Sequence, residues 1–225
     1  MSEPTGMVSD NKRIALERHG EAAGPLPVEF VVEEDDLVTI VHHELRTGAP
    51  DYDYFGFHTY RIKDGDVVDE WSNAVAGSST RGHGRAVPGR VPAQVGVGTP
   101  STNKTRVSDF YRCVFDARDP GAVKDFVHED YHQHSSHLPP GRAGLEALVA
   151  ETFPDGPAPT PDEPSMPPAI LMGEGDLVVI AAGLPQPDGM GGTYLRYLYD
   201  AYRVSDGFLR EHWSGVDPAH RPVMP

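Results

Sequence analysis

The sequence predicts an α+β protein whose antiparallel strands are organised around two related β-hairpins. The C-terminal hairpin runs from Thr193 to Val216 (TYLRYLYDAYRVSDGFLREHWSGV) and turns at Asp206-Gly207. The N-terminal hairpin runs from Tyr52 to Val75 (YDYFGFHTYRIKDGDVVDEWSNAV) and turns at Asp64-Gly65. Asp-Gly supplies the positive φ angles of a two-residue type I′ turn, and the flanking aromatic and β-branched residues favour strands. The C-terminal half reads as helix, helix, short strand, helix and then four strands.

The two hairpins belong to an internal duplication. Asp36-Leu37-Val38-Thr39-Ile40 matches Asp176-Leu177-Val178-Val179-Ile180, and Asn11-Lys12 matches Asn103-Lys104. The first copy lacks roughly 50 residues that the second copy contains, by the offset between the repeats. We therefore expect a partial copy over residues 1–76, with a short helix and four strands. A Gly-, Ser-, Pro- and Arg-rich linker would occupy 77–100, and a complete domain 101–225.

The remaining elements follow from local patterns. In the first copy we expect a helix over Asn11–Glu21 with Asp10 as N-cap, then two strands between Val28 and Leu45. In the second copy Asp119 precedes Pro120, an arrangement typical of a helix start. There the pattern predicts three helices, a short strand before the third, and two strands before the hairpin: Asn103–Phe115, Pro120–Val127, Tyr131–His137, Gly141–Phe153, Ala169–Met172 and Leu177–Ala182.

Composition restricts the function classes. The formal net charge of -15 argues against binding to a nucleic-acid backbone or an anionic membrane. Cys113 is the single cysteine, which permits no internal disulfide and suits a reducing cytoplasm. No signal peptide opens the chain, and no apolar run approaches the length of a membrane helix. We expect a cytoplasmic protein.

The C-terminal hairpin presents a candidate acid/base group. Counting outward from the turn places Asp200 opposite Trp213 and Tyr202 opposite Glu211, so these four side chains would share one face. Desolvation beside Trp213 and Tyr202 would raise the pKa of Asp200 towards the range useful for proton transfer. A structural ion pair with Arg196, or simple exposure, is the alternative. The same count places His212 on the opposite face, where a structural or interface role is expected.

A histidine-rich segment, HQHSSH, covers residues 132–137. His132 and His134 share a face if the segment is extended, and His137 adds a third imidazole. Several neutral imidazoles can bind zinc, but no acidic ligand accompanies them. Hydrogen bonding in a pocket, metal binding and plain surface exposure all remain open. We expect no metal here and no cofactor, since glycine-rich phosphate or dinucleotide loops are absent.

Several short motifs recur together in one order. They are Asn-Lys opening a helix, Tyr131-His132-Gln133-His134, Gly141-Arg142, Gly-Asp-Leu-Val at 175–178, Asp-x-Tyr-Arg-Val at 200–204, Asp206-Gly207 and Glu211-His212-Trp213. In this order they resemble the SnoaL-like polyketide cyclases of the nuclear transport factor 2-like superfamily. The match covers residues 102–217, and a weaker match of strands alone covers 28–75.

The resemblance implies a cone-shaped α+β fold, in which a bent antiparallel sheet wraps around three helices and leaves one deep apolar pocket. In that family an aspartate at the position of Asp200 acts as general base. It removes a proton next to a carbonyl, and the enolate closes a ring by aldol addition. A histidine at the position of His134 lies in the pocket of many relatives. Relatives often have Gln-His-Asn-Pro where this chain has Gln133-His134-Ser135-Ser136.

The expected function is therefore that of a cofactor-independent cyclase or isomerase of secondary metabolism, acting on a small apolar carbonyl compound. Asp200 would be the base, and His134, with His132 or Gln133, would polarise the carbonyl oxygen. Trp213, Tyr202 and Tyr111 would line the pocket. A hydrolase, for example of an epoxide, is the second possibility. A non-catalytic ligand-binding or dimerisation module is the third.

The first copy offers a second group of polar residues. His42, Glu44 and His58 could converge in this copy. Without the three helices that the second copy has, however, an open sheet cannot exclude water. We expect a structural role for this copy, with its sheet packed on another sheet, within the chain or in a homodimer. That contact would bury Val38, Ile40, Phe55 and Phe57. His58 would then stay hydrated with a pKa of about 6.5, and Asp200 rather than His58 would carry proton transfer.

Overall fold

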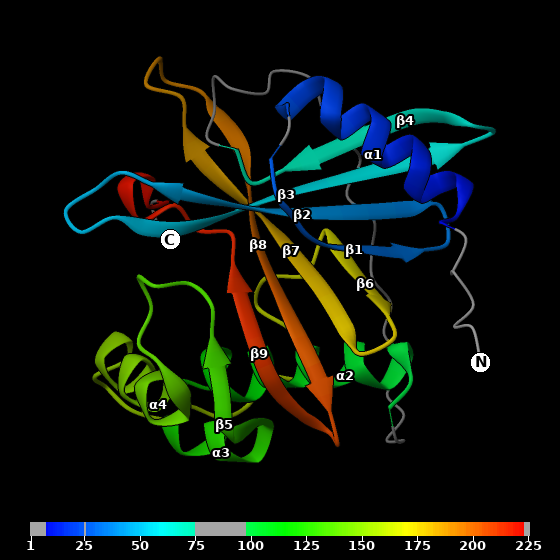
Figure 1. Cartoon of the computed structure of the whole chain (residues 1–225). Coiled ribbons are helices and arrows are strands. Elements are labelled where there is room, and N and C mark those ends of the chain that lie inside the picture. Colours follow the sequence, from blue (N-terminus) through cyan, green and yellow to red (C-terminus); the bar gives the residue numbers. More distant parts are fainter. Residues whose placement is uncertain (1–7, 25, 75–97, 223–225) are drawn as a thin grey trace.

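The computed structural model describes residues 8–24, 26–74 and 98–222, and it confirms the α+β class. Most of the predicted linker therefore lies outside the described residues. The N-terminal sheet has the order β1-β2-β3-β4, and the C-terminal sheet has the order β5-β9-β8-β7-β6 (Figure 1). All neighbours pair antiparallel except β5, which runs parallel to β9. The strands are β1 Val28–Glu34, β2 Leu37–Arg46, β3 Tyr52–Lys63, β4 Asp66–Ser72, β5 Val127–Gln133, β6 Ile170–Glu174, β7 Leu177–Pro187, β8 Thr193–Ser205 and β9 Phe208–Ser214.

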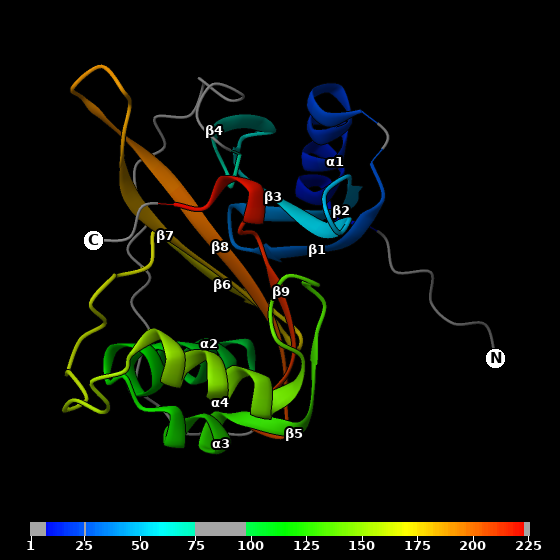
Figure 2. The same cartoon turned by 90° about the vertical axis from the view of Figure 1, so that its left-hand side faces the viewer.

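The helices lie at two ends of the molecule. Figure 2 shows α2, α3 and α4 together beside the C-terminal sheet, whereas α1 lies with the N-terminal sheet. The bounds are α1 Asp10–Ala23, α2 Pro100–Phe110, the π-helical η1 Tyr111–Asp116, the 3-10 helix η2 Pro120–Ala122, α3 Val123–Phe126, α4 Gly141–Thr152 and the 3-10 helix η3 Pro218–His220. None of the described helices is long and apolar enough to cross a membrane.

Three predicted boundaries need correction. Ser9, not Asp10, caps α1, because the Ser9 hydroxyl accepts the backbone N–H of Lys12 while Ser9 itself is extended. The continuous helix predicted after Asn103 changes at Tyr111 into a π-helical turn. The strand predicted over Tyr131–His137 instead ends at Gln133, because its parallel pairing with β9 runs from Val127 to Gln133. The predicted N-cap at Asp119 is confirmed, since its carboxylate accepts the N–H of Gly121.

Both hairpin turns have the expected geometry, but the pairing beyond them does not follow the simple count. Asp206 and Gly207 have φ angles of 54° and 74°, and Asp64 and Gly65 have 52° and 87°. Val204 pairs with Leu209, as counting outward from the turn requires, yet the next pair along is Arg203 with Glu211. Arg210 is thus an extra residue, a β-bulge. The N-terminal hairpin has the same irregularity between Arg61 and Ile62.

The bulge reverses the predicted sharing of faces. Asp200 lies opposite Ser214, and Tyr202 lies opposite His212. The prediction that Glu211 and Trp213 share the face of Asp200 is therefore wrong. A one-residue shift moves every later side chain to the other side of the sheet, because side chains alternate with a period of two. The corresponding shift in the N-terminal hairpin places His58 opposite Ser72, whereas counting from Asp64-Gly65 without a bulge would place it opposite Trp71.

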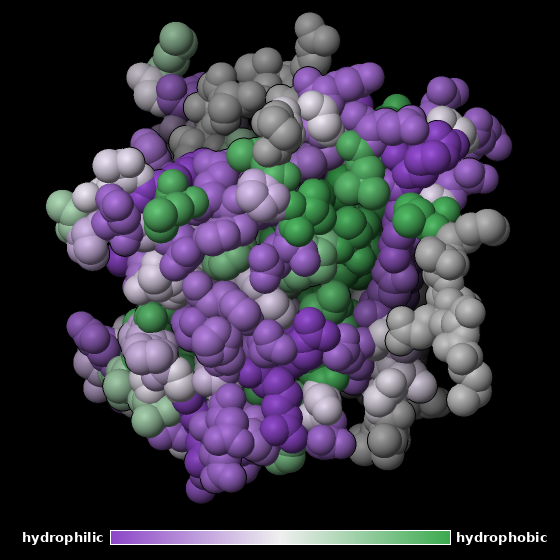
Figure 3. Space-filling model, in the orientation of Figure 1, coloured by the Kyte–Doolittle hydropathy of each residue, from purple (hydrophilic) through white to green (hydrophobic). Residues whose placement is uncertain are grey.

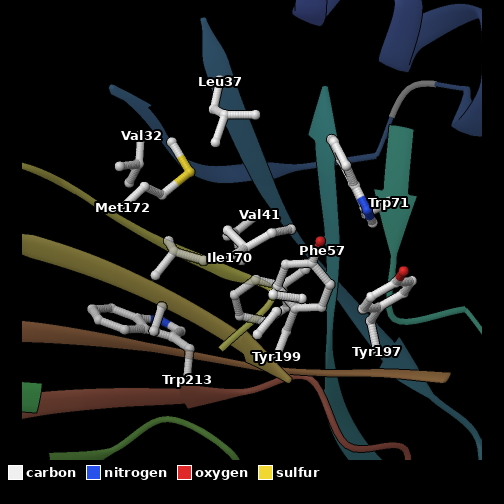
Figure 4. Packing of buried hydrophobic residues seen from close by; sticks show 14 of the residues in the cluster. Val32, Leu37, Val41, Phe57, Trp71, Ile170, Met172, Tyr197, Tyr199 and Trp213 are labelled. Atoms are coloured by element: carbon white, nitrogen blue, oxygen red, sulfur yellow. The ribbon is translucent and has the colours of Figure 1, made fainter. Parts of the chain in front are cut away.

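The two sheets pack face to face within the chain. Figure 4 shows the shared core, in which Phe57 and Tyr199 lie between the sheets with Trp71 and Trp213 on either side. Phe55 and Phe57 are buried there as predicted. Val38 and Ile40 do not belong to this core between the sheets. They pair with Tyr60 and His58, and they are buried against α1 on the other side of the N-terminal sheet. That sheet is thus covered on both faces, although apolar side chains remain visible over the region of β1 and β2 in Figure 3.

Ion pairs between the two halves are reciprocal. Lys12 donates to both carboxylate oxygens of Glu174, at 2.6 and 2.7 Å, and Lys104 pairs with Glu34. Each glutamate also accepts a backbone N–H from the opposite half. Lys12 matches Lys104 and Glu34 matches Glu174 in the predicted duplication. This exchange is what an approximate twofold arrangement of two copies produces, because the same patch then contacts itself.

Candidate functional site

Asp200 lies on the face of β8 that is turned towards the helices. Its Oδ2 accepts a hydrogen bond from the hydroxyl of Tyr111 at 2.7 Å. The Tyr111 oxygen lies 2.9 Å from that of Tyr202, and because Tyr111 already donates to Asp200, Tyr202 is the donor in this second bond. Tyr111 is the first residue of the π-helical η1, a type of turn that occurs frequently at functional sites. The side chain of Asp200 is 23% exposed, so one edge of the carboxylate is accessible.

A chain of hydrogen bonds holds the other carboxylate oxygen of Asp200, Oδ1, in place. The backbone N–H of Ser135 donates to Oε1 of Gln133 at 3.0 Å, so the Gln133 amide nitrogen must donate to Nδ1 of His212, 2.7 Å away. His212 then carries its proton on Nε2 and donates it to Oδ1 of Asp200 at 3.0 Å. Gln133 thereby determines the tautomer of His212, and His212 orients the carboxylate.

Aromatic rings enclose this network. Tyr202 stacks on His212 with ring centroids 4.6 Å apart and an interplanar angle of 13°, and Tyr131 lies nearly parallel to His212 at 6.5 Å. Burial raises the pKa values of Tyr111, Tyr131 and Tyr202 well above the usual value, and the negative charge of Asp200 acts in the same direction. The three phenols therefore stay neutral near pH 7, and those of Tyr111 and Tyr202 donate the hydrogen bonds described above.

His137 is the polar group next to this network that lacks a partner. Both of its ring nitrogens are buried without a hydrogen bond among the described residues. Burial lowers the pKa of His137, and the positive charge of Arg221 acts in the same direction, whereas Asp200 and Asp217 oppose the shift. A neutral imidazole with two unused ring nitrogens is equipped to exchange a hydrogen bond with a ligand.

His134 and Trp213 lie away from Asp200. Nε2 of His134 contacts Oε2 of Glu211 at 2.8 Å, and its ring stacks on Trp213 at 4.2 Å with an interplanar angle of 7°. His132 packs edge-on against His134 at 4.3 Å. Trp213 belongs to the core between the sheets. Of the predicted site residues, the structure thus brings Tyr111, Gln133 and Tyr202 to Asp200, and it groups His132, His134 and Trp213 elsewhere.

His212 is the residue that the sequence-based prediction missed. Counting without a bulge assigned it to the opposite face, yet it is the direct partner of Asp200. No glycine or proline stands at Arg210, so the residue types of the hairpin do not indicate the bulge. The one available signal was chemical, since shifting the register by one residue replaces Trp213 with an imidazole beside the carboxylate.

His58 also differs from its prediction. It is packed between His19 of α1 and His42 of β2. Burial, together with the neighbouring imidazoles of His19 and His42, lowers the pKa of His58 to about 3. The expectation of a hydrated His58 with a pKa of about 6.5 is wrong, because α1 covers this face of the N-terminal sheet and excludes the water that the expectation assumed.

Comparisons with known proteins give distant structural similarity. Neither a protein-family model nor a curated protein matches the chain. Among solved structures, the chain is similar to TsrD from Streptomyces laurentii, with 19% identity and a TM-score of 0.34 over 50% of this chain and 84% of that one. IdmH from Streptomyces antibioticus, named as a candidate polyketide cyclase, has 20% identity and a TM-score of 0.31 over 50% of this chain and 89% of that one.

A protein from Acidithiobacillus ferrooxidans, also named as a candidate polyketide cyclase, has 17% identity and a TM-score of 0.35. This similarity covers 50% of the present chain and 85% of the other.

Proposed function

We propose that this protein is a cofactor-independent cyclase or isomerase in which Asp200 removes a proton next to the carbonyl group of a small apolar compound. The observation that carries the proposal is the pair of hydrogen bonds that hold Asp200, one from Tyr111 and one from His212. Each carboxylate oxygen accepts one hydrogen bond and retains a further lone pair. A preoriented carboxylate beside buried aromatic rings is the arrangement that general-base catalysis requires.

The surrounding residues supply the remaining steps. His137 would donate a hydrogen bond to the carbonyl oxygen, where negative charge develops as Asp200 takes the proton from carbon. In a cyclisation, the enolate carbon then attacks a second carbonyl of the same molecule and forms a carbon–carbon bond. The proton held by Asp200 passes to the new alkoxide oxygen, which restores the carboxylate. In an isomerisation, the proton returns to a different carbon. His134 contacts Glu211, whose side chain faces away from that of His212 on β9, so we assign His134 no role at the carboxylate.

The proposal is tested through its first chemical step. The full chain is incubated in D2O with a panel of aromatic and cyclic ketones, acetophenone among them, and deuterium incorporation next to the carbonyl is followed by proton NMR. Enzyme-dependent exchange supports the proposal. Binding of several ketones without exchange would indicate a ligand-binding module instead, and conversion of an epoxide probe to a diol would indicate a hydrolase.

Gln133→Leu tests the positioning of the carboxylate. Leucine cannot donate to Nδ1 of His212, so the tautomer of His212 is no longer determined and Asp200 loses its fixed orientation. We expect the exchange rate at saturating ketone to fall between about tenfold and a hundredfold, as for a small misplacement of a reacting group, with little change in the ketone concentration that gives half-maximal rate.

The comparison of rate with half-maximal concentration separates this positioning role from a purely structural one. A general disturbance of the site would also raise the ketone concentration that gives half-maximal rate, whereas misorientation of Asp200 lowers the rate alone. An unchanged rate in a folded variant would show that Gln133 has no part in orienting Asp200. Asp176→Asn serves as the control, because Asp176 pairs with Arg203 at an exposed turn outside the network.

A further inference from the structure

Three imidazoles from three elements converge beneath α1. They belong to His19 of α1, His42 of β2 and His58 of β3. Their ring centroids are 4.8, 5.1 and 5.5 Å apart, and one nitrogen from each lies within 4.8 Å of the other two. Zinc binds histidine nitrogen at about 2.0–2.1 Å, so small side-chain rotations would bring all three nitrogens onto one ion.

Hydrogen bonds leave one nitrogen free on two of these rings. Nε2 of His42 contacts Oε1 of Glu44 at 3.1 Å, whereas its Nδ1 is buried with no partner among the described residues. Nδ1 of His19 lies 3.4 Å from the hydroxyl of Tyr60, whereas its Nε2 is likewise buried without a partner. His19 and His42 are 2% and 3% exposed, so water does not readily satisfy these nitrogens. An unsatisfied buried acceptor costs free energy unless a ligand fills the role.

We propose that His19, His42 and His58 bind a zinc ion, with a water molecule as its fourth ligand. Three protein ligands and an open fourth position are typical of zinc sites that carry out chemistry, whereas closed structural sites use four. Glu44 supplies the carboxylate partner that commonly orients a metal-bound histidine through its second ring nitrogen.

The surroundings of His42 are shaped for this arrangement. Gly56 lies directly opposite His42 in the sheet, and a Cβ atom at Gly56 would lie 2.1 Å from the His42 ring. Only glycine allows the imidazole to lie flat across the neighbouring strand, where it meets His58.

The position of this cluster parallels that of the candidate site in the other half. His58 and Asp200 occupy matching places in their hairpins. Asp200 faces the helices beside the C-terminal sheet, and His58 faces α1. The sequence-based expectation of no metal concerned the HQHSSH segment. It did not include His19, which lies in a helix far along the sequence from both hairpins and meets His42 and His58 only in the folded chain.

Zinc titration of the untagged full chain tests the proposal. The protein is first dialysed against a chelator, and binding is measured by calorimetry. The absorption spectrum of added Co2+ reports whether the coordination is tetrahedral. We expect one equivalent of metal and a tetrahedral spectrum. His58→Asn should weaken binding by more than a hundredfold, beyond the effect of losing a partner outside the coordination sphere. His43→Asn is the matched control, because His43 lies next to His42 but contacts Asp53 on the other face.

A second variant keeps the test decisive if loss of a ligand disturbs folding. Glu44→Gln retains the size of the side chain and leaves the three imidazoles in place, and it should weaken zinc binding about tenfold to a hundredfold. Circular dichroism establishes that each variant is folded. The proposal is overturned if the wild-type chain binds no zinc. It is equally overturned if folded His58→Asn and Glu44→Gln bind as tightly as the wild type, or if binding is lost only in the double variant His132→Asn/His134→Asn.

Discussion

Asp200→Asn should lower the rate of ketone deuterium exchange by at least about a hundredfold, the lower end of what a positioned general base contributes. Asparagine matches the size of aspartate but cannot take up the proton from carbon. Its amide can still meet Tyr111 and His212, so the network that holds the side chain is only partly disturbed. The rate is measured at saturating ketone, and ketone binding is measured separately by NMR titration.

The separation of rate from binding makes this experiment informative. In the proposed site, Asp200→Asn removes the catalytic base but should change the affinity for ketone little, because the aromatic side chains that would hold the substrate are unchanged. A variant that keeps the full exchange rate would exclude Asp200 as the base. Asp176→Asn provides the control for removing a carboxylate from the same sheet, since Asp176 contacts Arg203 and not the network.

Phe57→Ala is expected to lower the free energy of unfolding by about 3–5 kcal/mol, the range for deleting a large aromatic side chain from a packed core. Phe57 is 0% exposed and stacks on Tyr199 across the two sheets, with ring centroids 5.3 Å apart. The cavity would open in the middle of the contact that joins the two halves. Urea denaturation monitored by tryptophan fluorescence gives the value, since Trp71 and Trp213 lie in the same core.

Leu195→Ala is the control for this measurement. Leu195 is an apolar residue of β8 that is 57% exposed, so its truncation should change the unfolding free energy by no more than about 0.5 kcal/mol. Equal effects from the two substitutions would contradict the face-to-face packing. The loss in Phe57→Ala should also be independent of protein concentration, because the two sheets belong to one chain.

The sequence by itself determined the local features of this protein. Asp64-Gly65 and Asp206-Gly207 specified their turns because few residues accept the positive φ angles that such turns require. Alternating apolar residues predicted the strands, and Asp119-Pro120 predicted a helix start. These signals depend on neighbours a few residues apart, so they can be recognised without knowledge of the fold.

Only the tertiary structure decided which side chains meet. A bulge at Arg210 places His212 rather than Trp213 beside Asp200, and no glycine or proline stands at that point of the strand to mark it. Likewise, His19 meets His42 and His58 only because α1 lies across the N-terminal sheet. Side chains on a sheet alternate with a period of two, so one unpaired residue reverses every assignment beyond it. Contacts between distant segments follow from packing that no local pattern encodes.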